Sequence, residues 1–259
     1  MTGSTLSPWL ATLPALLVLG VAAWAIATAR RNAGLVDIFW SLFLLLAATV
    51  AFLQSPAALR GWLTMALASA WALRLAGYLA MRNWNAPEDR RYQAIRARNE
   101  PGFAWKSLYL VFGLQAVLAW LVSAPLVAAI SQPGAVGILG WVGAGLAAFG
   151  IAYETAADWQ LARFKSRAGS AGRVLDTGLW RYSRHPNYFG EFCVWWGFFL
   201  LAADGGGWWT VFSPLLMSLL LLRISGVTLL ERDIGERRPA YRDYVRRTRT
   251  FFPGPPKEA

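Results

Sequence analysis

The densest group of side chains capable of chemistry lies in residues 178–191, directly before an apolar run at 192–201. Asn187 and Glu191 are four residues apart, so they share one face of a helix that starts here. An asparagine both donates and accepts hydrogen bonds, as recognition of a carboxamide or an adenine amide requires. Pro186 suits the first turn of that helix, where free N–H groups favour anions. The candidate binding residues of this stretch are Tyr182, Arg184, His185, Asn187, Tyr188 and Glu191.

A second group precedes this stretch. Glu154, Asp158 and Lys165 are spaced by four and seven residues, which places them on one helical face. A carboxylate such as Asp158 suits a ribose or an amide donor, and Lys165 suits a phosphate. The alternative is that these residues form ion pairs within or between helices.

Asp37 and Arg74 are ionisable residues inside apolar runs, where charge is costly and a functional role is the default reading. Asp37 is either an acid within the site or the partner of an arginine such as Arg74 that fixes helix packing. Arg74, Tyr78 and Arg82 follow at intervals of four and share one helical face. Arg74 lies deepest and needs a phosphate or a carboxylate as partner.

The loop that follows, residues 87–98, is rich in arginine. It is either an amphipathic segment that lies on an anionic leaflet or a lid that offers arginines to a polyphosphate.

Long apolar helices must position these residues. Of 259 residues, 56% are hydrophobic and only 15% are charged, which is typical of an integral membrane protein. We expect an all-α fold and one domain over residues 1–259. The seven predicted spans are residues 10–29, 35–54, 61–81, 106–130, 136–161, 188–203 and 208–230.

The net charge of +11 follows the membrane topology rather than a nucleic-acid partner. Basic residues gather in the 30–34, 82–105 and 162–187 loops and in the C-terminal tail, whereas the other side of the membrane has only Arg60. The positive-inside rule then places the N-terminus outside and the C-terminus in the cytosol. We expect the bacterial inner membrane, with the active site open to the cytosol.

Taken together, the segments 158–165, 178–191, Glu231 and 244–253 resemble the C-terminal domain family of steroid 5α-reductases, including its bacterial members. Asp37–Trp40 and Glu88–Tyr92 extend the similarity to nearly the whole chain. Isoprenylcysteine carboxyl methyltransferases and sterol reductases carry a similar Arg-His-Pro element.

The resemblance implies a seven-span reductase whose cofactor half is about residues 150–259 and whose NADPH cavity opens to the cytosol. By position, it implies that Asp158, Lys165, Arg173, Tyr182, Asn187 and Glu191 contact NADPH. We add Arg74, Arg184, His185, Tyr188 and Tyr244 as further cofactor candidates. The eukaryotic steroid reductases have arginine where Lys165 stands, and serine-glycine-alanine where Arg184–Pro186 stands.

In that family a glutamate in span two and a tyrosine in span three hold the substrate ketone. Asp37 is the best match for the glutamate, and Trp71 or Tyr78 is the match for the tyrosine. Because desolvation raises the pKa of a carboxyl, we expect Asp37 to be a protonated donor to the ketone oxygen.

The expected enzyme is an NADPH-dependent oxidoreductase that reduces the Δ4 C=C bond of a 3-oxo-steroid or a similar lipophilic enone taken from the bilayer. The chain has no G-x-G-x-x-G unit between a strand and a helix, so NADPH would bind among helices and arginine-rich loops. We expect contact with membrane lipids, but no metal, no nucleic acid and no obligatory protein partner. The alternatives are an S-adenosylmethionine-dependent membrane methyltransferase and a transporter.

Overall fold

The computed structural model describes residues 6–56, 58–170, 172–224, 227, 231 and 240–257. Every regular element in these ranges is a helix, which confirms the all-α prediction. The chain forms two compact units: Met1–Trp141 with Phe199–Ser213, and Val142–Phe198 with Pro214–Ala259. Each unit is described by itself below.

Five helical segments are long and apolar enough to cross a membrane: Pro8–Ala29, Ala33–Leu53, Leu59–Asn83, Phe103–Val122 and Ile138–Lys165. They overlap the first five predicted spans, but the fourth ends at Val122 rather than at residue 130, because the chain turns at Ser123 and continues as a separate helix, Ala124–Ser131. The sixth predicted span is helix α9 (Pro186–Asp204) and the seventh begins as the shorter apolar helix Trp208–Ile224. Residues 225, 226 and 228–230 of the seventh span lie outside the described residues. The helices are those of a membrane protein, whereas the count of seven spans and the orientation stay predictions.

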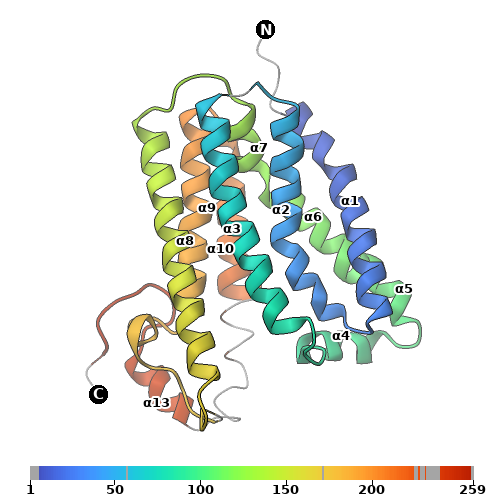
Figure 1. Cartoon of the computed structure of the whole chain (residues 1–259), viewed down its shortest axis with the longest axis vertical. Helices are drawn as coiled ribbons and strands as arrows, with labels where there is room; N and C mark the ends of the chain where they lie inside the picture. Colours follow the sequence, from blue (N-terminus) through green and yellow to red (C-terminus); the bar gives the residue numbers. More distant parts are fainter. Residues whose placement is uncertain are drawn as a thin grey trace. The chain divides into compact units, whose positions relative to one another are not determined.

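The first unit is built around helix α2 (Val36–Leu53). This helix contacts α1 (Leu6–Ala29), α3 (Leu59–Asn83), α6 (Leu114–Val122) and α7 (Ala124–Ser131) (Figure 1). It can do so because its apolar residues face all directions, as expected for a helix buried on every side.

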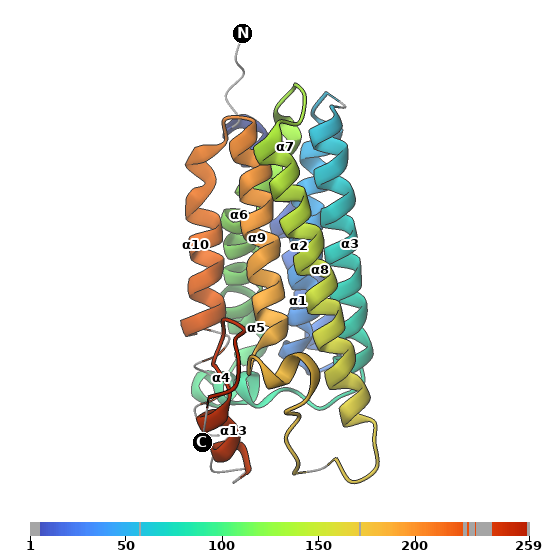
Figure 2. The same cartoon turned by 90° about the vertical axis from the view of Figure 1, so that its left-hand side faces the viewer.

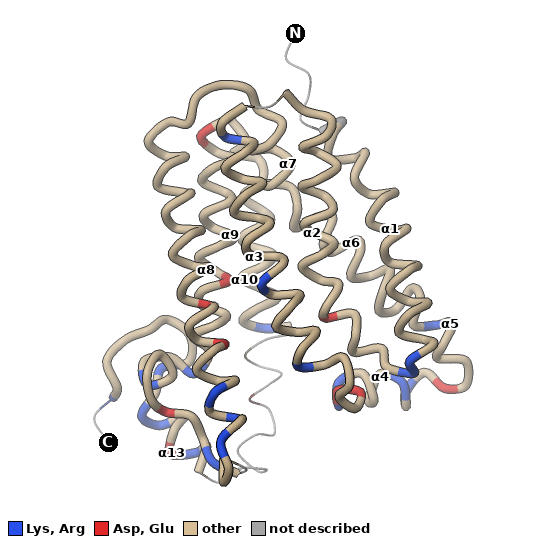
Figure 3. Tube along the Cα trace, viewed as in Figure 1, with Lys and Arg blue, Asp and Glu red and all other residues tan. Residues whose placement is uncertain are grey.

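The segment that follows α3 crosses the ends of α1 and α2 as the short helix α4 (Arg90–Asn99) (Figure 1). The chain then continues as α5 (Phe103–Ser107) and the π-helical turn η2 (Leu108–Gly113) into α6. In this unit, most basic residues gather on α4, on α5 and at the adjoining ends of α1 and α3 (Figure 3). This clustering agrees with the sequence-based expectation that the basic residues gather in the loops on one side of the membrane.

Arg60, the single basic residue expected on the other side, is buried and paired. Its Nη2 donates to Asp204 Oδ2 at 2.9 Å and to the Ala135 carbonyl oxygen at 2.6 Å. The amide of Gly137 donates to the same Asp204 oxygen at 2.9 Å. Removal of one partner would leave a buried charge uncompensated, so the pair holds this end of the first unit together.

The second unit contains α8 (Ile138–Lys165) from Val142 onward, α9 as far as Phe198, α10 (Phe212–Leu219) from Pro214 onward and α13 (Ala240–Arg247) (Figure 2). Glycines let α8 and α9 approach closely. A Cβ atom on Gly150 would lie 2.5 Å from the Gly190 carbonyl oxygen, and one on Gly190 would lie 2.7 Å from the Glu154 amide nitrogen. This contact brings Asp158 on α8 and Asn187 on α9 within hydrogen-bond distance.

Candidate functional sites

Two polar clusters in the structure hold sequence-predicted residues. The first is built where the start of α2 meets α4. Glu88, just before α4, accepts the Ala33 amide at 2.7 Å and two hydrogen bonds from Arg96, at 2.9 Å from Nε and 2.8 Å from Nη2. Burial by itself raises the pKa of Glu88, but the bonds from Arg96 and Ala33 outweigh it and the net pKa is lowered. These contacts fix α4 against the short 3-10 turn η1 (Ala33–Leu35) that precedes α2.

Asp37, in the first turn of α2, receives hydrogen bonds from two neighbours on α4. The Tyr92 hydroxyl donates to Oδ1 at 2.6 Å, and Arg91 Nη2 donates to Oδ2 at 2.9 Å. Both carboxylate oxygens of Asp37 thus act as acceptors, whereas the sequence predicts a protonated donor. Asp37 is thus paired with an arginine of α4, Arg91, whereas the sequence suggested an arginine such as Arg74.

Tyr92 is the buried hydroxyl donor of this cluster. It is only 7% exposed, and Gln115 Nε2 lies 3.4 Å from its hydroxyl oxygen. Burial, and then the negative charge of Asp37, raise the pKa of Tyr92 well above its ordinary value. The phenol therefore stays protonated over the physiological pH range and is a competent hydrogen-bond donor.

The other predicted residues of the first unit lie on α3. Trp71 is fully buried, whereas Arg74 and Tyr78 are half-buried. The Arg82 guanidinium lies over the Tyr78 ring, 5.7 Å from its centroid. Asp37 takes its hydrogen bonds from α4. The pairing of Asp37 with Trp71 or Tyr78 at a substrate ketone stays a prediction.

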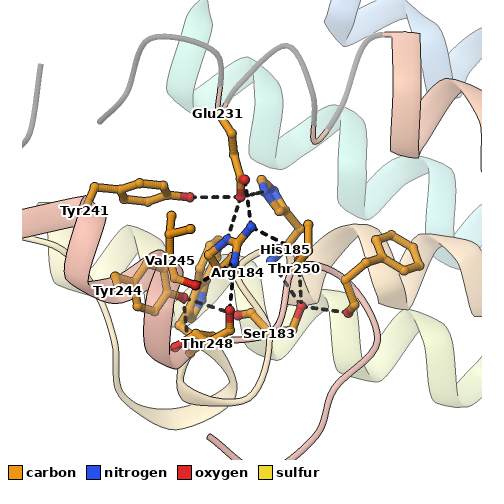
Figure 4. A network of polar contacts seen from close by, with 11 residues as sticks. Ser183, Arg184, His185, Glu231, Tyr241, Tyr244, Val245, Thr248 and Thr250 are labelled. Atoms are coloured by element: carbon orange, nitrogen blue, oxygen red, sulfur yellow. Dashed lines mark hydrogen bonds and ion pairs between the residues drawn. The ribbon is translucent and has the colours of Figure 1, made fainter. Parts of the chain in front are cut away.

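The second cluster, in the second unit, centres on Arg184 just before α9. All five N–H donors of its guanidinium have protein acceptors (Figure 4). Nε and Nη2 bind the two carboxylate oxygens of Glu231 at 2.7 and 2.8 Å. The remaining donors bind the Val245 and Thr248 carbonyl oxygens and the Thr250 hydroxyl. Arg184 therefore ties the motif to the C-terminal tail.

Glu231 is the common acceptor of this cluster (Figure 4). His185 Nε2 lies 2.8 Å from its Oε1, and the Tyr241 hydroxyl donates to the same oxygen at 3.3 Å. Burial by itself raises the pKa of Glu231, but the hydrogen bonds from His185 and Arg184 lower it to about 2. The carboxylate is consequently ionised at any pH the cell provides.

His185 is buried and held from two sides. Its Nε2 faces Glu231, and its ring stacks on the Tyr188 ring with 5.6 Å between centroids. The backbone amide of His185 donates to the Ser183 hydroxyl oxygen at 3.1 Å. A carboxylate on one ring nitrogen fixes the orientation of an imidazole, so His185 is rigidly placed beside the start of α9.

The C-terminal tail folds back over the motif. Arg184 and Gly254 donate backbone hydrogen bonds to Arg249 and Tyr182, at 2.9 and 3.2 Å. The hydroxyl of Tyr244, which is buried, donates to the Trp180 carbonyl oxygen at 2.5 Å. Tyr244 thus fastens α13 to the 178–185 turn.

The remaining predicted cofactor residues of the second unit differ in exposure. Asp158 is buried and accepts a hydrogen bond from Asn187 Nδ2 at 3.2 Å, and Glu191 is buried one turn further along α9. Lys165, Arg173 and Tyr182 are exposed. An amide donor, carboxylate acceptors and exposed cations thus lie near the end of α8. Together they suit a ligand that carries phosphate and amide groups.

Sequence reasoning counted Glu88–Tyr92 and Glu231 among the segments that carry the resemblance, but it did not assign Arg91, Tyr92 and Glu231 as site residues. Tyr92 is 55 positions from Asp37, and Glu231 is 47 positions from Arg184. A further signal is that α4 and the tail are charged segments beside apolar helices, where a buried charge such as Asp37 needs a partner.

Comparison with known proteins found a family model that matches a region of the chain containing both clusters. The profile of the family described as "Protein of unknown function (DUF1295)" matches residues 23–248. No curated protein and no solved structure gives a significant match to the chain. The matched region holds the Asp37–Tyr92 pair and the Arg184–Glu231 pair, and it spans most of the sequence. The chain therefore belongs to the DUF1295 family.

Proposed function

We propose that this protein is an NADPH-dependent oxidoreductase that reduces the activated C=C bond of a lipophilic enone, such as a 3-oxo-Δ4-steroid. The observation that carries the proposal is the 2.6 Å hydrogen bond between the buried Tyr92 phenol and Asp37 in a membrane-type helical unit. A protonated phenol held beside a carboxylate is a donor suited to a ketone oxygen that gains negative charge.

Reduction of an enone adds a hydride at the β-carbon and a proton at the α-carbon, and between these steps the ketone oxygen carries negative charge. NADPH, when bound, supplies the hydride. In our proposal the Tyr92 hydroxyl turns from Asp37 to the ketone oxygen and stabilises the enolate. A proton from solvent then adds at the α-carbon and completes the reduction. Asp37 orients the phenol, and Arg91 neutralises Asp37 at 2.9 Å.

This assignment revises the expected role of Asp37. A carboxylate that accepts hydrogen bonds from both Arg91 and Tyr92 is poorly suited to donate a proton itself. The raised pKa of Tyr92 keeps the donor protonated, so Tyr92 takes the place proposed for a tyrosine of the third span.

The second unit offers side chains for the cofactor. Asn187 presents an amide at the start of α9, next to the carboxylates of Asp158 and Glu191. Exposed Lys165 and Arg173 can meet phosphates. Arg184 does not fit a direct phosphate contact, because all five of its donors are engaged within the protein. We therefore assign Arg184 the role of holding the motif in place.

The proposal includes seven spans, an outside N-terminus and a cytosolic C-terminus in the bacterial inner membrane. The clustering of basic residues at the α4 and α5 end of the first unit supports this orientation (Figure 3). Cytosolic NADPH and a substrate from the lipid then reach the protein from different phases.

Two measurements on the detergent-purified protein test the proposal. NADPH should raise the unfolding temperature by mass action, and it should be oxidised at 340 nm when a suitable enone is present. The panel should include 3-oxo-Δ4-steroids, short-chain enones and the matching saturated ketones as controls. S-adenosylmethionine is tested in parallel, because the Arg-His-Pro element also occurs in membrane methyltransferases.

Stabilisation by NADPH together with enone-dependent oxidation would support the reductase. Stabilisation by S-adenosylmethionine alone would instead favour the methyltransferase. A lack of response to both cofactors would overturn the enzymatic proposal.

A further inference from the structure

The first unit contains a cavity that borders the first cluster at Ala33 and Arg96 but is not lined by Asp37, Arg91 or Tyr92. It has a volume of about 280 Å³ and lies where the end of α1 meets α5. This is near the lower end of small-molecule sites, roughly 300 Å³. Its apolar lining includes Phe103 and Phe112, and its polar lining consists of Thr28, Arg31, Arg96 and Ser107.

Arg31 lines this cavity with an unusual backbone. The Asn32 amide donates to the Ala27 carbonyl oxygen at 2.9 Å, and the Arg31 amide donates to that of Thr28 at 3.0 Å. This pattern is the Schellman motif that ends α1, and its left-handed position is usually a glycine. Here Arg31 occupies it with a φ of 51°. A disfavoured backbone at a cavity points to a functional reason for the side chain.

The charge of Arg31 is available to a ligand. Arg30, its neighbour, donates to the Trp84 carbonyl oxygen at 2.9 Å and lies over the Trp84 ring. Arg96 is held by Glu88. Within the described part of the chain, the exposed Arg31 guanidinium has no hydrogen-bond or ion-pair partner. The cavity thus combines an uncommitted cation with aromatic walls.

Two tryptophans beside the cavity indicate its depth. Trp24 Nε1 donates to the carbonyl oxygen of Ala104, which lines the cavity, at 2.7 Å, and the Trp24 and Trp105 rings lie 5.0 Å apart. Trp105 is 70% exposed. Tryptophans concentrate at the level of lipid headgroups in membrane proteins, so the cavity lies at the interface rather than in the hydrocarbon layer.

We propose that this cavity binds a phosphate-bearing amphiphile, with the phosphate at Arg31 and Thr28 and an apolar portion against Phe103 and Phe112. A guanidinium and a hydroxyl are suited donors to phosphate oxygens. The ligand is either the headgroup of an anionic membrane phospholipid or a free phosphorylated molecule, since both present the same chemistry.

Native mass spectrometry of the full chain in an uncharged detergent tests the proposal. The protein is titrated with dioleoyl phosphatidylglycerol and, separately, with dioleoyl phosphatidylcholine. The wild type should bind the anionic lipid more tightly. Arg31→Gly should weaken this binding roughly ten-fold, the loss expected for one charge-assisted hydrogen bond.

Further variants distinguish loss of the Arg31 charge from loss of the fold. Arg31→Gly suits the left-handed position, so its unfolding temperature should equal or exceed that of the wild type. Arg31→Lys should retain part of the affinity, and Thr28→Val should lose part of it. Arg242→Ala removes an exposed arginine of the second unit and should leave binding unchanged.

Inorganic phosphate distinguishes the two sources. If it raises the unfolding temperature in an Arg31-dependent manner and the two lipids bind equally, the ligand is a free phosphorylated molecule. If only phosphatidylglycerol binding depends on Arg31, the ligand is a lipid headgroup. If Arg31→Gly behaves like Arg242→Ala in both experiments, the site does not exist.

Discussion

The Arg184 guanidinium and the Glu231 carboxylate face each other through two parallel hydrogen bonds of 2.7 and 2.8 Å. The pair joins the turn before α9 to a residue 47 positions later, and the tail returns from there to close over the same turn. The motif that looked like a set of ligand-binding residues is thus partly a structural clamp. Stability measurements can separate the two roles.

Replacement of Glu231 by Gln should destabilise the second unit. The neutral side chain leaves Arg184, which is 7% exposed, without its counter-charge, and loss of one partner of a buried ion pair costs roughly 3 kcal/mol. We expect a lower unfolding temperature by tryptophan fluorescence and faster proteolysis of the tail. Asp243→Asn, which breaks the exposed pair with Arg246, is the control and should have little effect. Equal behaviour of the two variants would contradict the clamp.

The ion pair of Arg184 with Glu231 should also stabilise the second unit less in acid. The pKa of Glu231 is lowered from 4.5 to about 2, so its stabilisation is complete above pH 4.5 and is lost as the pH falls toward 2. The difference in unfolding temperature between wild type and Glu231→Gln should shrink as the pH falls from about 4.5 toward 2. Because Glu88 and Asp89 are present in both proteins, their titration cancels. A difference that persists unchanged at pH 3 would refute the assignment.

Tyr92→Phe should abolish most turnover without loss of cofactor binding. Removal of one hydrogen-bond donor to a developing oxyanion costs roughly a hundred-fold in kcat. Asp37→Asn should lower kcat too, because the amide can point its N–H group at Tyr92 and disturb the orientation of the phenol. Tyr109→Phe, which removes an exposed hydroxyl, should be neutral. Full activity of Tyr92→Phe, measured as NADPH oxidation with an enone, would eliminate Tyr92 as the donor.

Asn187→Ala and Glu191→Ala should weaken NADPH binding while leaving the fold intact. Each change removes polar groups at the start of α9, and the loss of one hydrogen bond to a ligand corresponds to roughly a ten-fold change in affinity. Titration calorimetry on the detergent-purified variants gives the dissociation constants. Thr155→Ala alters an exposed position on α8 and serves as the matched control. Unaltered affinity for NADPH in both variants would rule out a cofactor site at the start of α9.

Gly190→Ala should destabilise the contact of α8 with α9. The added Cβ atom would lie 2.7 Å from the Glu154 amide nitrogen, so one helix must move, at a cost of roughly 1–3 kcal/mol. Gly145→Ala is the control, because a Cβ there meets nothing within 4 Å and alanine favours the helix. A lower unfolding temperature is expected for the first variant only. If Gly190→Ala is as stable as Gly145→Ala, the close approach is not needed.

The positions of the long helices could be read from the sequence because they depend on local composition. A run such as 35–54 is apolar throughout, and α2 occupies Val36–Leu53. Pro186 predicted the start of α9, and the helix begins there. By contrast, the turn at Ser123 divides the apolar run 106–130 into α6 and α7, and α4 forms in an arginine-rich loop where no apolar pattern marks a helix. Their limits depend on packing against neighbouring helices.

The amino-acid sequence by itself determined that the chain is helical and membrane-embedded, and that its ionisable residues concentrate at helix ends. These properties follow from hydropathy and from the cost of charge in lipid, which act on each segment separately. Tertiary structure alone decided the partners of those residues. It placed Tyr92 and Arg91 on Asp37, and Glu231 on Arg184 and His185. Such pairs join positions about 50 residues apart, and only the folded path of the chain determines which carboxylate a given donor can reach.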